Sequence, residues 1–253
     1  MLSKEVHFDY LIRQADNCLI LGQRLGEWCG HGPVLEQDIA MTNISLDLIG
    51  QSRSLYQYAA KIQGDGKSED DLAYLRDVLQ FRNFLLVEQP NEDFGYTVAR
   101  QFFFDVFNYH FYKELAANSN DEQLVNIAVK SLKEVSYHVK WSSEWIIRLG
   151  DGTDESHERI QAAVNDRWPY TGEMFIPNQT DEEALKLGIG IDLVKIKPLW
   201  DKMVSDTLAE ATLEKPEASW MHQGGKDGRH TEHLGYILAD LQFLQRAYPG
   251  ASW

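Results

Sequence analysis

The sequence predicts an all-α protein with a four-helix bundle core and additional helices packed around it. Apolar residues recur at three- and four-residue steps over several long segments, as on one face of an α-helix. Glycine and proline cluster at short breaks between these segments, and the alternation typical of strands is almost absent. With 253 residues, 43% of them hydrophobic, the chain is expected to bury its core as a single domain, residues 1–253.

The first two long helices are predicted at about residues 8–29 and 34–62, on either side of a break rich in glycine and proline. Cys18 and Cys29 fall in or at the end of the first helical pattern, where we expect reduced, hydrophobe-like thiols. The second segment is apolar on more than one side, which predicts a helix buried all round. Leu35, Ile39, Leu46 and Ile49 share one side, while Met41, Ile44, Leu48 and Leu55 cover others.

The remaining long helices of the bundle are predicted at about 94–117 and 120–150, after one or two shorter helices within 69–87. The 94–117 segment holds more aromatic side chains than one core-facing stripe accommodates. Further helices are expected near 155–166, 191–214 and 231–248, with an irregular stretch at 168–172. We expect these to pack around the bundle.

Charge and hydropathy exclude several classes of partner. The formal net charge of −15 disfavours binding to phosphate backbones and to anionic lipid, so we expect neither nucleic acid nor membrane as a partner. Residues 1–10 lack the pattern of a signal peptide, and no apolar run is long enough to cross a bilayer. We therefore expect a cytoplasmic protein.

A four-helix bundle invites a test for a carboxylate-bridged di-iron site, which needs a Glu-x-x-His pair on each of two helices. Residues three apart point the same way from a helix, so both side chains can reach one metal ion. No Glu-x-x-His occurs in the chain. The corresponding places hold Asp47 with Gly50, and Glu134 with Tyr137, followed one residue late by His138.

Two interpretations of the polar residues in the middle of these helices remain open. One is a surviving metal site formed by Asp47, Asp105, Glu134 and His138. The other, which we favour, is a hydrogen-bonded network or a solvated helix face, because a buried charge must be paired. The polar companions on the other helices are Asp16 or Asn17, and Asp105 with Asn108.

Two other histidine-containing motifs also have a structural explanation. Asp154 and His157 are three residues apart, but they follow a glycine-rich turn and are typical of a helix start. His230 and His233 have metal-compatible spacing, yet no third ligand accompanies them and Thr231 again indicates a helix start. No dinucleotide fingerprint, Walker loop or nucleophile elbow is present. By itself, this pattern favours an interaction role over catalysis.

Five separated stretches together resemble the PaaC-type subunit of the bacterial phenylacetyl-CoA epoxidase. They are LILGQRLGEWCGH at 19–31, NISLDLIGQ at 43–51, SLKEV at 131–135 with Tyr137 and His138, WIIRLGDG at 145–152, and GRHTEHLGY at 228–236. The resemblance covers nearly the whole chain. It implies a ferritin-like chain related to the catalytic PaaA-type subunit but without its di-iron ligands.

The resemblance also implies a role. The chain is expected to pair with a PaaA-type catalytic subunit, as a heterodimer or higher heteromer, and to stabilise it within a complex that epoxidises the ring of phenylacetyl-CoA during phenylacetate catabolism. No cofactor is expected in this chain; di-iron, flavin, iron-sulfur and NADPH are expected in partner subunits. No catalytic residue is carried over, and Asp47, Gly50, Asp105, Glu134, Tyr137 and His138 are expected to be vestigial positions only.

The surplus apolar faces of the 34–62 and 94–117 helices are then the expected surface for the partner, because obligate interfaces are large and core-like. Two alternatives to a structural subunit remain. One is a self-standing metalloenzyme with a degenerate carboxylate site. The other is an acyl-CoA binding module in which the 167–179 stretch binds the nucleotide end of the ligand.

Overall fold

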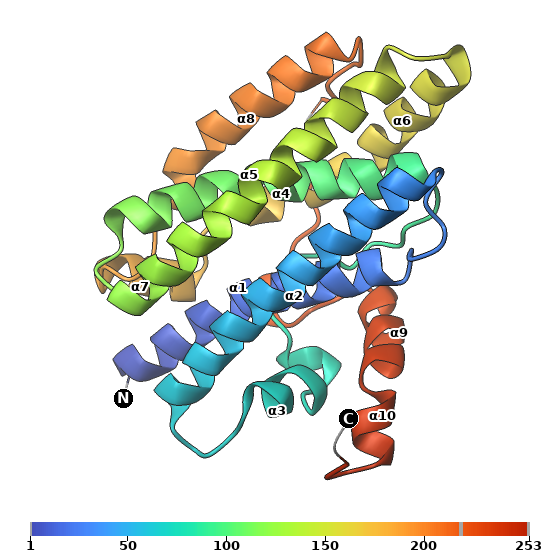
Figure 1. Ribbon diagram of the computed structural model, residues 1–253. Coiled ribbons are helices and arrows are strands. Elements are labelled where there is room, and N and C mark those ends of the chain that lie inside the picture. Colours follow the sequence, from blue (N-terminus) through green and yellow to red (C-terminus); the bar gives the residue numbers. More distant parts are fainter. Residues whose placement is uncertain (1, 218–219, 252–253) are drawn as a thin grey trace. The chain divides into compact units, whose positions relative to one another are not determined.

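The computed structural model describes residues 2–217 and 220–251, and every regular element in these ranges is helical (Figure 1). The all-α prediction is confirmed. The chain divides into two compact units, one formed by residues up to Glu88 together with those from Gly224 onward, the other by Gln89–Gln223. Within the described ranges, no helix combines the length and apolarity needed to cross a membrane.

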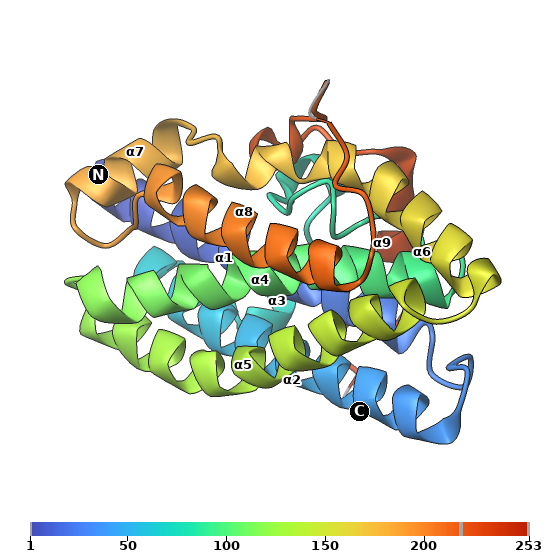
Figure 2. The same ribbon diagram turned by 90° about the horizontal axis from the view of Figure 1, so that it is seen from above.

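The first unit is built on a helical hairpin, α1 (Leu2–Gly26) and α2 (Leu35–Gln63), whose helices lie side by side (Figures 1 and 2). The helices approach closely at Gly22, where the Ser45 hydroxyl donates to the Gly22 carbonyl at 2.7 Å. A Cβ at Gly22 would lie 3.3 Å from the Ser45 carbonyl oxygen and 3.2 Å from Ile49, so the approach depends on glycine.

The first helix ends earlier than its apolar pattern predicts. Turn hydrogen bonds replace the helix after Gly26, and Cys29 is exposed, so its expected place in the helical pattern is wrong. Cys18 is buried in α1, as expected. The difference arises because a periodic pattern continues through residues whose backbone already turns toward α2.

Short elements complete the first unit. Ser68 and Asp71 form a capping box that starts α3 (Glu69–Tyr74), and a short 3-10 helix, η1 (Val78–Gln80), follows it. The chain returns to this unit with η4 (Gly225–Asp227), α9 (Glu232–Leu241) and α10 (Phe243–Ala247). The single helix expected at 231–248 is therefore two helices, interrupted at Gln242.

The second unit contains another long hairpin, α4 (Phe94–Asn118) and α5 (Glu122–Gly150). Two further helices pack against α4, namely α6 (Asp154–Arg167) and α8 (Leu193–Glu210). The irregular stretch forms two 3-10 turns, η2 (Trp168–Tyr170) and η3 (Gly172–Phe175). The structure adds α7 (Gln179–Lys186), a short helix that no apolar period announces and that an Asn178–Asp181 capping box starts.

Most aromatic residues of α4 are buried, and several contact other elements of the second unit. Phe103 contacts Trp168 and Trp200, and the indole N–H of Trp200 donates to the Phe103 carbonyl at 2.9 Å. Because α5, α6 and α8 pack on different sides of α4, its rings are buried on several faces at once. The expectation that α4 keeps an apolar face for a partner is wrong.

Helix α2 is also not buried all round, contrary to the expectation. Met41, Ile44, Leu48 and Leu55 are buried, whereas the four apolar residues of the other side are exposed. The reason is that α2 packs on α1 and α3 by one face only. The exposed side chains are Leu35, Ile39, Leu46 and Ile49, and we call them the α2 seam.

Candidate functional site

A buried polar pair lies in the middle of the α4–α5 hairpin. Asp105 of α4 and His138 of α5 are both buried and close enough to interact electrostatically. The Gln101 side-chain amide donates to Asp105 Oδ1 at 2.7 Å, and Ser142 also hydrogen-bonds the Asp105 carboxyl. The structure thus brings together two of the six predicted site positions, from two adjacent helices.

Burial dominates the pKa of Asp105. Burial raises the pKa of Asp105 to about 7, although His138, Ser142 and Gln101 each act to lower it. The carboxyl is therefore partly protonated near neutral pH. An arrangement of one carboxyl, one imidazole, one hydroxyl and one amide can hold or exchange a proton inside the helix pair.

The other predicted positions lie elsewhere on their helices. Glu134 is half-buried, and Tyr137 is 49% exposed on the outside of α5. Position 138, and not 137, faces the interior, because the buried side of α5 continues from Val135 through His138 to Ser142. In the first unit, Asp47 of α2 is half-buried and Gly50 is exposed.

The donor set has limited capacity for a metal ion. Over the part of the chain that the structure describes, no three His, Cys, Asp or Glu side chains converge as metal ligands would.

At the 154–157 motif, Thr153 caps α6, Asp154 lies in the first turn, and His157 Nδ1 is 2.7 Å from the Gly150 carbonyl. The helix-start interpretation of this motif is confirmed, although the cap is Thr153 and not Asp154.

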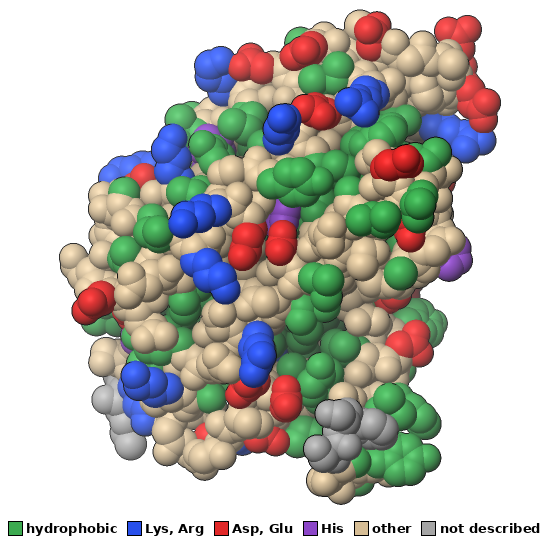
Figure 3. All heavy atoms as spheres, viewed as in Figure 1, with side chains coloured by type: hydrophobic (Ala, Val, Ile, Leu, Met, Phe, Trp, Pro, Cys, Tyr) green, Lys and Arg blue, Asp and Glu red, His purple; other side chains and the backbone are tan. Residues whose placement is uncertain are grey.

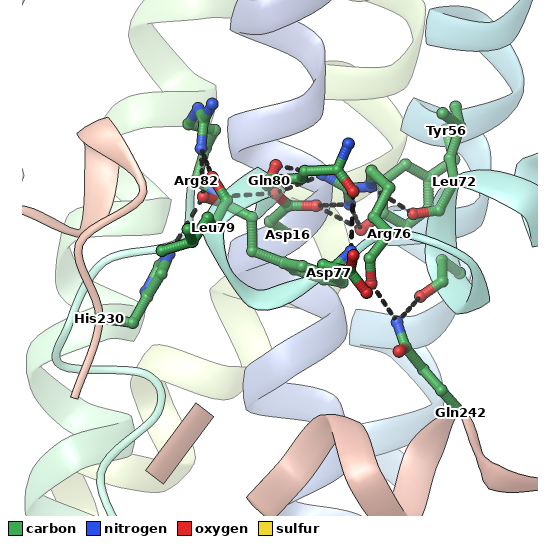
Figure 4. A network of polar contacts seen from close by, with 12 residues as sticks. Asp16, Tyr56, Leu72, Arg76, Asp77, Leu79, Gln80, Arg82, His230 and Gln242 are labelled. Carbon is green, nitrogen blue, oxygen red and sulfur yellow. Dashed lines mark hydrogen bonds and ion pairs between the residues drawn. The ribbon is translucent and has the colours of Figure 1, made fainter. Parts of the chain in front are cut away.

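Asp16 is the centre of a buried polar network in the first unit (Figure 4). Its carboxylate accepts hydrogen bonds from the Tyr56 hydroxyl at 2.5 Å, from the Arg82 backbone N–H at 2.7 Å and from both Arg76 Nη atoms. The Arg76 guanidinium also lies 4.2 Å from the centroid of the Phe81 ring. These contacts join α1 and α2 to the segment that contains η1.

The charges in this network stabilise one another. Burial acts to lower the pKa of Arg76, but Asp16 and Tyr56 outweigh it and raise the net value. Burial, followed by the negative charge of Asp16, raises the pKa of Tyr56. Neighbouring Asn17 accepts from the Phe84 backbone N–H at 2.7 Å. Asp16 and Asn17 thus hold the chain after α3 in place, which makes their role structural.

Glu88 is the centre of a second network, at the end of the same segment. Its Oε1 accepts from the backbone N–H and the hydroxyl of Thr231 at 2.7 and 2.8 Å, while Oε2 accepts from Asn83 at 2.9 Å. His230 Nδ1 lies 2.9 Å from Oε2, and Arg24 donates to the Glu88 backbone carbonyl. His230 is therefore an ion-pair partner that precedes α9, as the helix-start interpretation predicts.

Neither Glu88 nor Arg76 was identified from the sequence. Glu88 directly follows the apolar run Phe84–Val87, and an acidic residue at the end of such a run indicates a buried, paired carboxylate. Arg76 carries no comparable signal, because its partners Asp16 and Tyr56 are distant in sequence.

The α2 seam is a row of apolar side chains that the described part of the chain leaves exposed. Leu35, Ile39, Leu46 and Ile49 follow one another at steps of four, seven and three residues, which match the a and d positions of a heptad repeat. Figure 3 shows apolar side chains spaced along α2 on this face of the molecule. Such a row fits the side of another long helix.

The chain is similar in sequence to known proteins over nearly its whole length. Residues 2–253 match the family model described as phenylacetic acid catabolic protein. The chain is 47% identical over 244 residues to a protein of Escherichia coli strain K12 that is named as a subunit of the 1,2-phenylacetyl-CoA epoxidase. That match covers 96% of this chain and 98% of the relative.

Proposed function

Because the chain belongs to the phenylacetic acid catabolic protein family, we propose that it is a non-catalytic structural subunit of a multicomponent phenylacetyl-CoA epoxidase. In this role it pairs with a PaaA-type catalytic subunit and stabilises it. The observation that carries the proposal is the α2 seam, an apolar row that the chain's own packing leaves exposed. The similarity to a relative named as a subunit supplies the complex in which a partner would cover that row.

The seam specifies what the partner presents. Leu46 is 62% exposed, and each such side chain contributes about 1.5–3 kcal/mol when it is fully buried. Heptad spacing favours a long partner helix that runs along α2 at a small crossing angle. Gly50, which is exposed and has nothing within 4 Å of a built Cβ, leaves room for that helix to approach.

The chemistry of the polar positions supports a non-catalytic role. Asp105 and His138 offer one carboxyl and one imidazole, whereas a carboxylate-bridged di-iron centre takes several carboxylates and two imidazoles. A carboxyl with a pKa of about 7 competes for a proton and is a poor metal ligand at neutral pH. We therefore assign di-iron, flavin, iron-sulfur and NADPH to partner subunits. As a separate part of the proposal, we expect the complex in the cytoplasm.

Co-expression with the catalytic subunit of the same organism's epoxidase tests the pairing. We expect a stable complex whose activity requires this chain, and Leu46→Asp lowers the affinity at least about tenfold by placing a charge in the interface. The matched control is Val194→Asp on α8, because Val194 is 61% exposed and lies outside the seam. Equal affinity for both variants would contradict the seam as the interface.

A second measurement addresses the catalytic role. The metalloenzyme alternative requires iron bound to the isolated chain in a fixed ratio, together with turnover that depends on Asp105 or His138. Elemental analysis of the purified chain and an activity assay without partners distinguish the two proposals. Iron in stoichiometric amounts with turnover by the chain alone would reject the structural role.

A further inference from the structure

The C-terminal helices present apolar side chains on two opposite sides. Leu234, Ile237 and Leu238 of α9 are buried. On the outer side, Tyr236 is 69% and Phe243 is 61% exposed. Because the inner side already attaches these helices to the first unit, the outer aromatic residues are not needed to hold the fold together.

Polar contacts hold this helix pair in a fixed orientation. The buried Gln242 side-chain amide donates to the backbone carbonyls of Ala73 and Arg76 at 3.1 and 3.0 Å (Figure 4). Arg246 donates to the carbonyls of Tyr74 and Arg76 and to the Asp77 carboxylate. A surface that is rigid before binding loses little conformational entropy when it binds.

Two grooves flank Arg246 on this surface. One of about 470 Å³ is bordered by Asp77, Val78 and Phe243. The other, of about 640 Å³, is bordered by Asp70, Leu75 and Tyr248. We call the exposed apolar residues of these grooves and of α9 and α10 the C-terminal face: Leu75, Tyr236, Phe243, Leu244 and Tyr248. Figure 3 shows hydrophobic side chains gathered over this end of α9 and α10.

The rim of the C-terminal face is acidic. Asp70 and Asp77 border the grooves, and Asp240 lies one turn from both Tyr236 and Phe243 on the outer side of α9. Arg246, a cation that borders both grooves, forms an ion pair with Asp77, so Asp70 and Asp240 supply the excess negative charge of the rim. The rim therefore complements a positively charged surface, in a chain whose net charge is −15.

We propose that the C-terminal face is a second docking surface, separate from the α2 seam, for a further protein subunit that presents apolar side chains surrounded by lysine and arginine. The proposal rests on the proposed function for the source of that subunit, since a multicomponent epoxidase supplies more than one partner. The apolar centre provides the affinity, and the acidic rim provides the selectivity for a basic partner.

Deuterium exchange of the full chain, alone and in the purified complete epoxidase, tests the location. We expect slower exchange at 232–248 and 69–80 in the complex, in addition to protection along α2. Protection of α2 without any at 232–248 overturns this inference and leaves the proposed function standing. Protection at 232–248 without any along α2 instead rejects the α2 seam as the interface with the catalytic subunit. A dimer of the isolated chain in which 232–248 is protected also overturns the inference about the C-terminal face, because the occupant is then a second copy of this chain.

Variants test the chemistry. The purified pair of this chain with its catalytic subunit is titrated with each remaining purified epoxidase subunit. We expect Phe243→Ser to weaken one of these associations about tenfold or more, and Asp240→Lys to weaken the same association most strongly at low salt. Leu199→Ser on α8 is the control, since Leu199 is 50% exposed and lies in the second unit. Unchanged affinity of Phe243→Ser for every subunit overturns the inference.

Discussion

His230 lies between two oxygen atoms: Nδ1 is 2.9 Å from a carboxylate oxygen of Glu88, and Nε2 is 3.0 Å from the backbone carbonyl of Phe81. A carbonyl only accepts, so Nε2 carries a proton. The Glu88 carboxylate accepts at the other nitrogen, since it also accepts from Asn83 and Thr231. When the ring is protonated, both nitrogens donate, and the ion pair with Glu88 holds the residues before α9 against the rest of the first unit.

The first prediction concerns pH. Burial alone lowers the pKa of His230, but the hydrogen bond and charge of Glu88 outweigh it and raise the net pKa above 6.5. The ion pair thus contributes fully to stability below about pH 6.5, and the contribution is lost as pH rises through the raised folded-state value. His230→Gln should abolish this part of the pH dependence of the unfolding free energy. His233→Gln, at a half-buried neighbour outside the ion pair, is the control and should keep it.

A second prediction concerns the Asp16 network. Arg76→Met removes the guanidinium and leaves the buried Asp16 carboxylate without its cation, which should lower the unfolding free energy by about 3–5 kcal/mol. The exposed Arg148→Met should change it by less than about 1 kcal/mol. Denaturant titration measures both. The double variant Asp16→Leu with Arg76→Met should recover part of the loss, and no recovery would contradict the buried-charge explanation.

The third prediction concerns Asp105. Since its folded-state pKa is raised to about 7, the folded chain binds more protons than the unfolded chain between about pH 4 and 7, and stability falls as pH rises through this window. Asp105→Asn cannot ionise, so its unfolding free energy should be flatter between pH 4 and 7. A parallel pair of curves for the two proteins would show that Asp105 titrates normally.

A fourth prediction compares two glycines. Gly22→Ala places a methyl group 3.2–3.4 Å from α2 atoms and should lower the unfolding free energy by about 1–3 kcal/mol. Gly50→Ala meets nothing within 4 Å in an exposed helical position and should raise it by about 0.5–1 kcal/mol. Thermal denaturation of both variants provides the measurement. Gly50→Ala should weaken the association with the catalytic subunit more than Gly22→Ala does, because it fills the space beside the α2 seam.

The elements could be predicted from the sequence because their signals are local. The long helices α2, α4 and α5 were placed to within a few residues, since apolar period and glycine or proline breaks act over one or two turns. Helix α7 was missed because it is short and held by its cap. Of the candidate site, Asp105 and His138 were identified as residue types, but their proximity was not.

By itself, the sequence determined an all-helical chain, the absence of a Glu-x-x-His pair and the family of the chain. The tertiary structure decided which apolar sides are covered: both sides of α4 are buried, whereas the α2 seam is open. It also decided that Asp16 pairs with Arg76, 60 positions away. The physical reason is that periodicity reports how side chains are distributed around one helix, whereas burial and charge pairing depend on which neighbour reaches each side.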